Sequence, residues 1–218
     1  MISNARQANY TYFRKQFSAF PTQSKILDVG AGRGRYKEFI PEFTNITTLD
    51  NGPYPGIDVV HDLKDPLPFP DNSFDIILLS NVLEHFENTE QLLKECRRVL
   101  KKGGFVIGAV PFMIQIHQEP RDFYRFTLYG LEYHFKNAGY QNVSVEPLGL
   151  GVHTYTTMQR IFFEDIRLQA NRRRGILSRV ASRLMVLSHD IMNGAFRRLY
   201  SLASGDKYRE SYGFSAKK

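Results

Sequence analysis

Short apolar segments alternate with helix-like segments over the first two thirds of the chain, and this alternation limits the fold more than any other feature. Apolar runs typical of buried strands lie at 25–30, 46–50, 57–62, 74–80 and 105–112. Segments with apolar residues at helical spacing separate several of these runs. Because strands joined by single helices form a parallel sheet covered on both faces, the sequence predicts a doubly wound α/β domain.

Three glycines at alternate positions follow the first predicted strand, in the stretch KILDVGAGRGRY at 25–36. They are Gly30, Gly32 and Gly34. In an open parallel sheet, ligands bind beyond the carboxyl ends of the strands, which is where this loop would lie. A missing Cβ lets a ligand approach the main chain or lets the chain take a positive φ. We therefore expect a ligand site here; the alternative is a tight turn that binds nothing.

The spacing of the glycines and the acid in front of them argue against a dinucleotide. The dinucleotide fingerprint is G-x-G-x-x-G, whereas the third glycine here falls one place early and Arg35 holds the sixth position. Asp28 would also repel a pyrophosphate at the mouth of the loop. A cationic ligand fits this chemistry better. S-Adenosylmethionine has a sulfonium, an ammonium and no phosphate, so it matches an acid next to an open glycine loop.

The stretch ILDVGAGRGRY resembles the first motif of class I S-adenosylmethionine-dependent methyltransferases, and later stretches follow the order of that family. The segment ITTLD ends in an acid, and HDL is similar to the adenine-contacting segment after the third strand. The stretches PLPFPDNSFDIILLSNVLEHF and LLKECRRVLKKGGFVI resemble the fourth and fifth strands of the UbiE-like subgroup, methyltransferase type 11. The resemblance covers about residues 24–150.

This resemblance implies S-adenosylmethionine as cofactor and a set of residues that bind it. Asp50 would accept both ribose hydroxyls, although an acid at that place could also merely end a strand. Glu84 and His85 follow the fourth predicted strand and could face the methionine end of the cofactor, or they could equally be residues that start a local helix. No metal site is expected. The predicted cofactor-binding residues are Asp28, Gly30, Gly32, Gly34, Asp50, Asn51, Asp62, Leu63, Asn81 and Val82.

The resemblance also implies how the sheet ends. In this fold the last two strands form an antiparallel pair, which 141–147 and 209–218 would supply. The expected architecture is an α/β, doubly wound, mostly parallel, seven-stranded Rossmann-like sheet with a helical insertion between the last two strands. The methyltransferase domain would comprise residues 1–150 and 207–218, and the basic insertion residues 151–206.

A second informative stretch, FMIQIHQEPRDFYRFT at 112–127, follows the fifth predicted strand, where acceptor-binding loops lie in this fold. Its charges could serve solubility alone, but the apolar residues between them favour a loop that packs against other groups and is not extended in water. Methyltransferases from bacterial glycan and lipid clusters often show a similar order of residues here. We expect His117 to act as a general base oriented by Asp122. Arg125, Tyr124 and His85 would bind the acceptor.

The excess positive charge of the chain lies in its last third. Residues 151–218 hold 13 of the 29 Lys and Arg but only 5 of the 22 Asp and Glu. Within them, 176–203 predicts an amphipathic helix whose apolar stripe must be covered. Residues 160–203 could pack on the protein's own core, form a homodimer or dock on an anionic membrane. Nucleic acid is an unlikely partner, because no known binding module is recognisable.

Together these features predict an S-adenosylmethionine-dependent methyltransferase acting on a small-molecule or lipid/glycan-linked acceptor, with methylation on oxygen. The alternatives are a nucleic-acid methyltransferase and a non-catalytic binding module of the same fold. We expect a cytoplasmic protein, because no signal peptide or membrane-spanning run is recognisable. Peripheral membrane contact stays an alternative to packing of residues 160–203 on the protein itself. The single cysteine, Cys96, fits a reducing compartment.

Overall fold

The computed structural model describes residues 4–34, 40–149 and 210–218, without the side chains of 4–6, and eleven single positions between 159 and 191. The chain divides into two compact units. The first comprises Met1–Phe112, Ile116–Gly149 and Ser211–Lys218, and the second Met113–Gln115 and Leu150–Glu210. The sheet and the site described below belong to the first unit.

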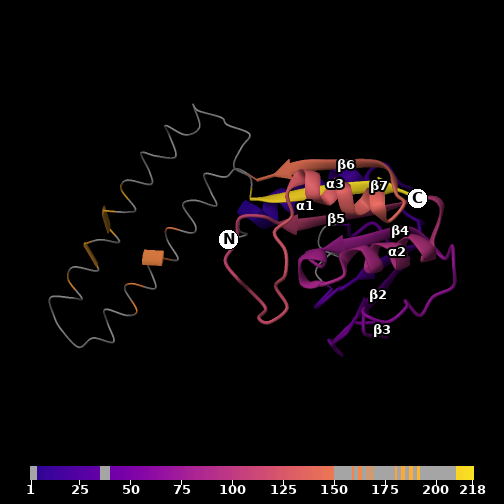
Figure 1. The fold of residues 1–218 in the computed structure, drawn as a ribbon, viewed down its shortest axis with the longest axis horizontal. Helices are drawn as coiled ribbons and strands as arrows, with labels where there is room; N and C mark the ends of the chain where they lie inside the picture. The colour runs from indigo at the N-terminus through magenta and orange to yellow at the C-terminus, as the bar shows by residue number, and fades with distance from the viewer. Residues whose placement is uncertain are drawn as a thin grey trace. The chain divides into compact units, whose positions relative to one another are not determined.

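A seven-stranded sheet in the order β3-β2-β1-β4-β5-β7-β6 forms the centre of the first unit (Figure 1). The strands are β1 (Ile26–Val29), β2 (Ile46–Asp50), β3 (Val59–Val60), β4 (Phe74–Ser80), β5 (Leu100–Pro111), β6 (Gln141–Leu148) and β7 (Ser211–Lys217). Strands β1 to β5 pair in parallel, and β7 runs antiparallel to both β5 and β6. This order confirms the predicted doubly wound sheet with its antiparallel end.

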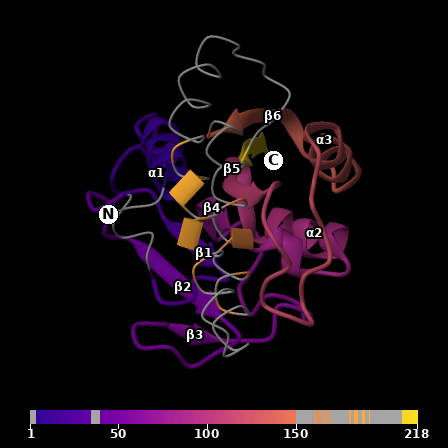
Figure 2. The same ribbon diagram turned by 90° about the vertical axis from the view of Figure 1, so that its left-hand side faces the viewer.

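Helices cover both faces of the sheet: α1 (Asn4–Phe17) lies on one side, and α2 (Thr89–Val99) and α3 (Leu128–Asn137) lie on the other (Figure 2). Two buried apolar clusters result. Ile76 and Leu78 of β4 belong to the cluster that contains Phe13 and Phe17 of α1. Alternate residues of the same strand, such as Ile77, belong to the cluster on the other face. Because side chains alternate along a strand, burial of both faces explains four consecutive apolar residues, IILL, in β4.

Strand β5 begins earlier than the sequence predicts, at Leu100 rather than at 105. Apolar residues at helical spacing predict a helix over 88–101, ended by the glycines of KKGG. In the structure α2 ends at Val99, and the KKGG stretch forms part of β5. The reason is pairing with β4, because Leu100 lies opposite Phe74 across an irregularity in the register. The segment RYKEFIPEF at 35–43 is typical of a helix, but it falls largely outside the described residues.

Most of the predicted insertion at 151–206 also lies outside the described residues. Of the apolar stripe expected within 176–203, the described positions are Val180, Leu184, Leu187 and Ile191, which are helical and exposed. Within the described part of the chain, none of the helices combines the length and the apolar character that crossing a bilayer requires.

A glycine at the middle of β5 sets how closely three strands approach, and replacing it should test this packing. A Cβ at Gly108 would stand 2.1 Å from the Leu79 carbonyl oxygen and 2.3 Å from the Phe214 ring. Gly108→Ala should therefore lower the free energy of unfolding by about 3 kcal/mol, measured by urea denaturation with far-UV circular dichroism. Ser144→Ala, at an exposed position of β6, should change it by less than about 0.5 kcal/mol. Equal stability of the two variants would contradict this packing.

Candidate functional site

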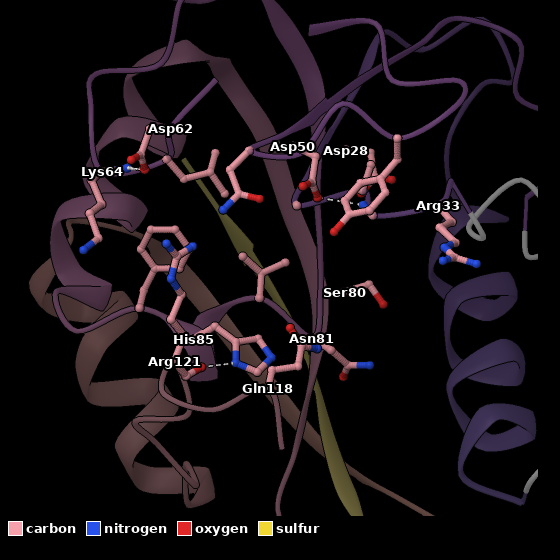
Figure 3. A pocket seen from close by; sticks show the side chains of 18 of the residues that line it. Asp28, Arg33, Asp50, Asp62, Lys64, Ser80, Asn81, His85, Gln118 and Arg121 are labelled. Atoms are coloured by element: carbon pink, nitrogen blue, oxygen red, sulfur yellow. Dashed lines mark hydrogen bonds between the residues drawn. The ribbon is translucent and has the colours of Figure 1, made fainter. Parts of the chain in front are cut away.

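A cavity of about 860 Å³ lies at the carboxyl ends of the parallel strands (Figure 3). This position follows from the strand order, because the chain reverses direction across the sheet between β1 and β4 and leaves a crevice there. The residues that line the cavity are Asn9, Asp28, Gly30, Ala31, Gly32, Arg33, Asp50, Asn51, Tyr54, Asp62, Leu63, Lys64, Ser80, Asn81, Val82, His85, Phe86, Gln118 and Arg121.

The first two glycines after β1 are required for different reasons. Both have positive φ, 72° at Gly30 and 57° at Gly32. A Cβ at Gly30 would stand 2.6 Å from Cγ2 of Val82, so this glycine allows the loops after β1 and β4 to approach. At Gly32 no described atom lies within 4 Å of the Cβ position. The peptide of Gly32 is therefore bare toward open space, as a ligand that packs on the main chain requires.

Asp50 ends β2 and connects two loops of the site. Its Oδ2 accepts a hydrogen bond from the Gly32 amide at 2.8 Å, and its Oδ1 accepts one from the Gly52 amide at 3.0 Å. The residue is only 7% exposed. Because each carboxylate oxygen can accept two hydrogen bonds, Asp50 keeps acceptor capacity on both oxygens for a ligand with two neighbouring hydroxyls.

Asp28, in the middle of β1, is a buried acid with an unsatisfied oxygen. It is 2% exposed, and its Oδ2 has no hydrogen-bond partner among the described residues. Burial, and then the nearby Asp50 carboxylate, raise the pKa of Asp28 well above its ordinary value. Two carboxylates at the base of the cavity favour a cationic ligand over a phosphate.

Nine of the ten predicted cofactor-binding residues line this one cavity, and Gly34 is the exception. Leu63 is buried, while Asp62 is exposed and its Oδ1 accepts a hydrogen bond from the Lys64 amide at 3.0 Å. Asn81 adopts a positive φ of 55° directly after β4. Asn9 on α1 also lines the cavity, and no motif in the sequence indicates it.

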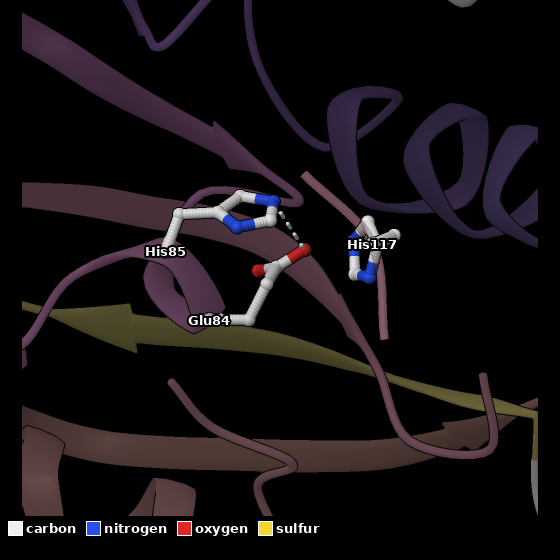
Figure 4. A group of neighbouring side chains, drawn as sticks. All are labelled: Glu84, His85 and His117. Atoms are coloured by element: carbon white, nitrogen blue, oxygen red, sulfur yellow. Dashed lines mark ion pairs between the residues drawn. The ribbon is translucent and has the colours of Figure 1, made fainter. Parts of the chain in front are cut away.

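A cluster of Glu84, His85 and His117 lies beside the cavity (Figure 4). His85 belongs to a short 3-10 helix, η2 (Leu83–His85), that follows β4, and it is the only member of the cluster that lines the cavity in the described structure. Its Nδ1 donates to the carbonyl oxygen of Arg121. Its Nε2 is buried and lies 3.7 Å from Oε1 of Glu84. Burial lowers the pKa of His85.

Glu84 was not among the predicted site residues, yet it is fully buried. Neither carboxyl oxygen has a hydrogen-bond partner in the described part of the chain. Burial raises the pKa of this carboxyl to about 8. Its main-chain oxygen accepts hydrogen bonds from the amides of Phe123 and Tyr124, at 2.9 and 3.2 Å, which attaches the 112–127 loop to η2. The signal for this residue was the adjacent pair of Glu84 and His85 after β4, also consistent with a helix start.

The structure gives the other predicted acceptor-site residues partners within the protein. Arg125 donates two hydrogen bonds to Asp122, at 2.7 and 2.8 Å, and this pair holds the pKa of Asp122 well below its ordinary value. Asp122 also accepts from the His117 amide at 2.9 Å and lies 3.4 Å from His117 Nδ1. The Tyr124 hydroxyl donates to the Glu87 carbonyl.

Among the described residues, His117, Asp122, Tyr124 and Arg125 therefore do not line the cavity. The sequence predicts that Arg125 binds the methyl acceptor, whereas in the structure its guanidinium is paired with Asp122. Nδ1 of His117 also lies 3.4 Å from Nη2 of Arg125, and the catalytic roles of His117 and Asp122 stay predictions.

Comparisons with known proteins relate this chain to methyltransferases. Residues 27–108 match the model of a family described as a methyltransferase domain. The chain is 36% identical to a protein of Methanocaldococcus jannaschii over 113 residues, 46% of this chain and 53% of that protein. It is 30% identical over 96 residues to a probable S-adenosylmethionine-dependent methyltransferase of Mycolicibacterium smegmatis, 39% of this chain and 37% of that protein. A demethylmenaquinone methyltransferase of Lysinibacillus sphaericus is 42% identical over 55 residues, 25% of this chain and 24% of that protein.

These matches span about half or less of the relatives' own length. Among solved structures, a SAM-dependent methyltransferase from Archaeoglobus fulgidus aligns with a TM-score of 0.60 and 15% identity. The alignment covers 96% of this chain and 92% of that one, and at this identity it shows the fold. The resemblance to class I methyltransferases that the motifs indicate is thus confirmed.

The pair of Asp122 and Arg125 should stabilise the 112–127 loop. Asp122→Asn removes the charge from a carboxylate that is 3% exposed and bonded twice by Arg125. We expect the free energy of unfolding to fall by about 2 kcal/mol in urea denaturation. Glu119→Gln neutralises an exposed acid of the same loop and should have little effect. A stability loss that is the same in both variants would show that this pair does not anchor the loop.

Proposed function

We propose that this chain, a relative of the class I S-adenosylmethionine-dependent methyltransferases, transfers a methyl group from S-adenosylmethionine to a small-molecule or lipid/glycan-linked acceptor, on oxygen. One observation supports the proposal above all others. Asp28 and Asp50, both buried, stand together at the base of one cavity, next to the bare peptide of Gly32. A positively charged nucleoside satisfies this combination, and a dinucleotide phosphate does not.

The residues around the cavity offer each part of S-adenosylmethionine a matching group. The free acceptor capacity of Asp50 suits two ribose hydroxyls. The unpartnered Oδ2 of Asp28 offers negative charge to the cationic end of the ligand. Leu63 and Val82 provide apolar surface on the wall of the cavity, which suits the faces of an adenine ring.

S-Adenosylmethionine would supply an electrophilic methyl group, which an acceptor atom attacks in line with the departing sulfur. Because no covalent help from the protein is needed, the chain contributes mainly by holding the two reactants at the correct distance and angle. A hydroxyl acceptor must also lose a proton, which calls for a group that titrates near neutral pH. An imidazole nitrogen can accept such a proton, and the cluster holds two imidazoles, one of them His85 on the cavity wall, which supports oxygen as the acceptor atom.

The acceptor class rests on the 112–127 loop and on the relatives. One relative is named as a demethylmenaquinone methyltransferase, whose name refers to a lipid-like acceptor. In this chain, Gln118 and Arg121 of the loop reach the cavity wall beside His85. These two polar side chains on one wall suit an acceptor with hydroxyl groups, such as a quinol-like, glycan-linked or other hydroxylated molecule.

Removing the Asp50 carboxylate should weaken cofactor binding specifically. For Asp50→Ala we expect the dissociation constant for S-adenosylhomocysteine to rise about 10- to 100-fold by calorimetry, because hydrogen bonds to a charged acceptor are lost. Asp65→Ala removes an exposed acid that does not line the cavity and should leave the constant unchanged. Methyl transfer itself is tested by incubating the protein with labelled S-adenosylmethionine and a panel of hydroxylated acceptors. Binding without transfer to any acceptor would favour a non-catalytic module.

Burial of Asp28 should couple cofactor binding to pH. Its pKa is raised in the free protein, and a bound cation lowers it again, so S-adenosylmethionine should displace protons on binding. Affinity should therefore increase with pH across the range in which Asp28 titrates. Calorimetry in buffers of different ionisation enthalpy measures the protons released. Asp28→Asn, which has no proton to lose, should bind with no such release; a release of the same size in this variant would assign it to another group.

A further inference from the structure

The cluster beside the cavity consists of side chains that bind metal ions. Glu84 and His85 come from η2, and His117 comes from the loop after β5 (Figure 4). One ligand atom from each residue lies within 4.8 Å of the other two. Two imidazoles and one carboxylate are a ligand set found around zinc and other divalent first-row transition ions in proteins.

The cluster contains buried polar atoms that the described residues leave unsatisfied. Both oxygens of Glu84 and Nε2 of His85 lack a hydrogen-bond partner in the described part of the chain. Glu84 is fully buried, so bulk water does not reach its carboxyl group. The 3.7 Å between His85 Nε2 and Glu84 Oε1 is too long for a hydrogen bond between them. Because buried polar groups in folded proteins are normally satisfied, a bound ligand would explain three such atoms in one place.

Each histidine ring of the cluster has a second partner that fixes its orientation, as is usual for histidines that bind a metal ion. The Nδ1–H of His85 donates to the Arg121 carbonyl, so the neutral ring presents the lone pair of Nε2 on the side of Glu84. His117 Nδ1 lies 3.4 Å from both Oδ2 of Asp122 and Nη2 of Arg125, so this ion pair holds the His117 ring in place. Carbonyl and carboxylate partners of this kind set the tautomer and direction of ligating histidines.

We propose that Glu84, His85 and His117 form a binding site for one divalent transition-metal ion such as Zn²⁺. Ligand atoms about 2.1 Å from a common ion are at most about 4.2 Å apart. A separation of up to 4.8 Å therefore closes with a small rotation of one side chain. Three protein ligands leave a position open on a tetrahedral ion, as in catalytic zinc sites and unlike structural ones.

The position of His85 indicates what the open site would do. His85 lines the cavity together with Gln118 and Arg121, so an ion on its Nε2 lies next to the cavity wall. Resting on the proposed methyl transfer, the ion would bind the acceptor hydroxyl and lower its pKa. The hydroxyl proton would pass to water, the oxygen would form a bond to the methyl carbon, and the carbon–sulfur bond would break with its electron pair remaining on sulfur.

The direct test is metal binding by the full chain, without an affinity tag and after treatment with a chelator. Co²⁺ serves as the probe, because its visible absorption reports binding by nitrogen and oxygen ligands, and Zn²⁺ is then added in competition. We expect one Co²⁺ per wild-type chain, displaced by one Zn²⁺. His117→Ala and Glu84→Gln should each weaken Co²⁺ binding at least about 100-fold.

Two matched controls separate this site from incidental binding. His61→Ala removes a histidine whose Nε2 is bonded to the Pro66 carbonyl, and Glu87→Gln removes an exposed acid near η2. Both should bind Co²⁺ as the wild type does. Binding of S-adenosylhomocysteine by each variant shows that the variant is folded. If a variant does not fold, the number of Co²⁺ ions bound per wild-type chain tests the metal site.

Wild-type protein that binds neither ion, or His117→Ala that binds as tightly as wild type, would overturn the metal site. The cluster would then be a set of proton-transferring groups only. Because metal binding is measured without S-adenosylmethionine, its failure leaves the proposed methyl transfer standing if S-adenosylhomocysteine still binds. Conversely, a bound ion without cofactor binding would refute the proposed function and keep the site.

Discussion

The site depends on a pair of buried carboxylates, Asp28 and Asp50, that the sheet holds close enough together for the charge of Asp50 to raise the pKa of Asp28. Asp28 lies in β1 and Asp50 ends β2, and these neighbouring parallel strands bring both side chains to one edge. Asp50 is satisfied by the amides of Gly32 and Gly52, whereas Asp28 keeps an oxygen unbonded among the described residues. Burial of two acids disfavours the charged form of Asp28, and a cation in the cavity reverses this preference. The parallel register of two strands thus determines the sign of the ligand's charge.

The same strand arrangement brings together the residues on the side of the cavity where we propose that the acceptor binds. The parallel strands β4 and β5 end at the edge where β1 and β2 end, so the segments that follow them meet over the cavity. The segment after β4 supplies Glu84 and His85, and the one after β5 supplies His117. The Glu84 carbonyl, which accepts the amides of Phe123 and Tyr124, and the ion pair of Asp122 with Arg125 fix the second segment to the first. Charged residues of the loop thereby stabilise the wall of the site and leave His85, Gln118 and Arg121 facing the cavity.

The sequence predicts most of the cofactor side and much less of the acceptor side, for a physical reason. Asp28 and Asp50 stand in or at the end of short apolar strands, so the position of each along the chain determines its place in the sheet. The early start of β5 depends on its register with β4, which is a tertiary contact that no local pattern encodes. Likewise, the partners of Arg125 and the approach of Glu84 to His117 depend on how a loop folds back. Local chemistry predicts residue types in such a loop but not which of them will pair.

A buried carboxyl group stands at each end of the site, and we propose a different cationic ligand for each. At one end Asp28, and at the other Glu84, is a buried carboxyl whose pKa burial raises, and each keeps oxygens unbonded among the described residues. A protein that needed these positions only for packing could place a leucine there at lower cost, since burying an unsatisfied carboxyl is unfavourable. A carboxylate in such a place becomes favourable when a cation binds to it. The sulfonium and ammonium of the proposed cofactor would serve Asp28, and the proposed metal ion would serve Glu84, so both acids are explained by one rule.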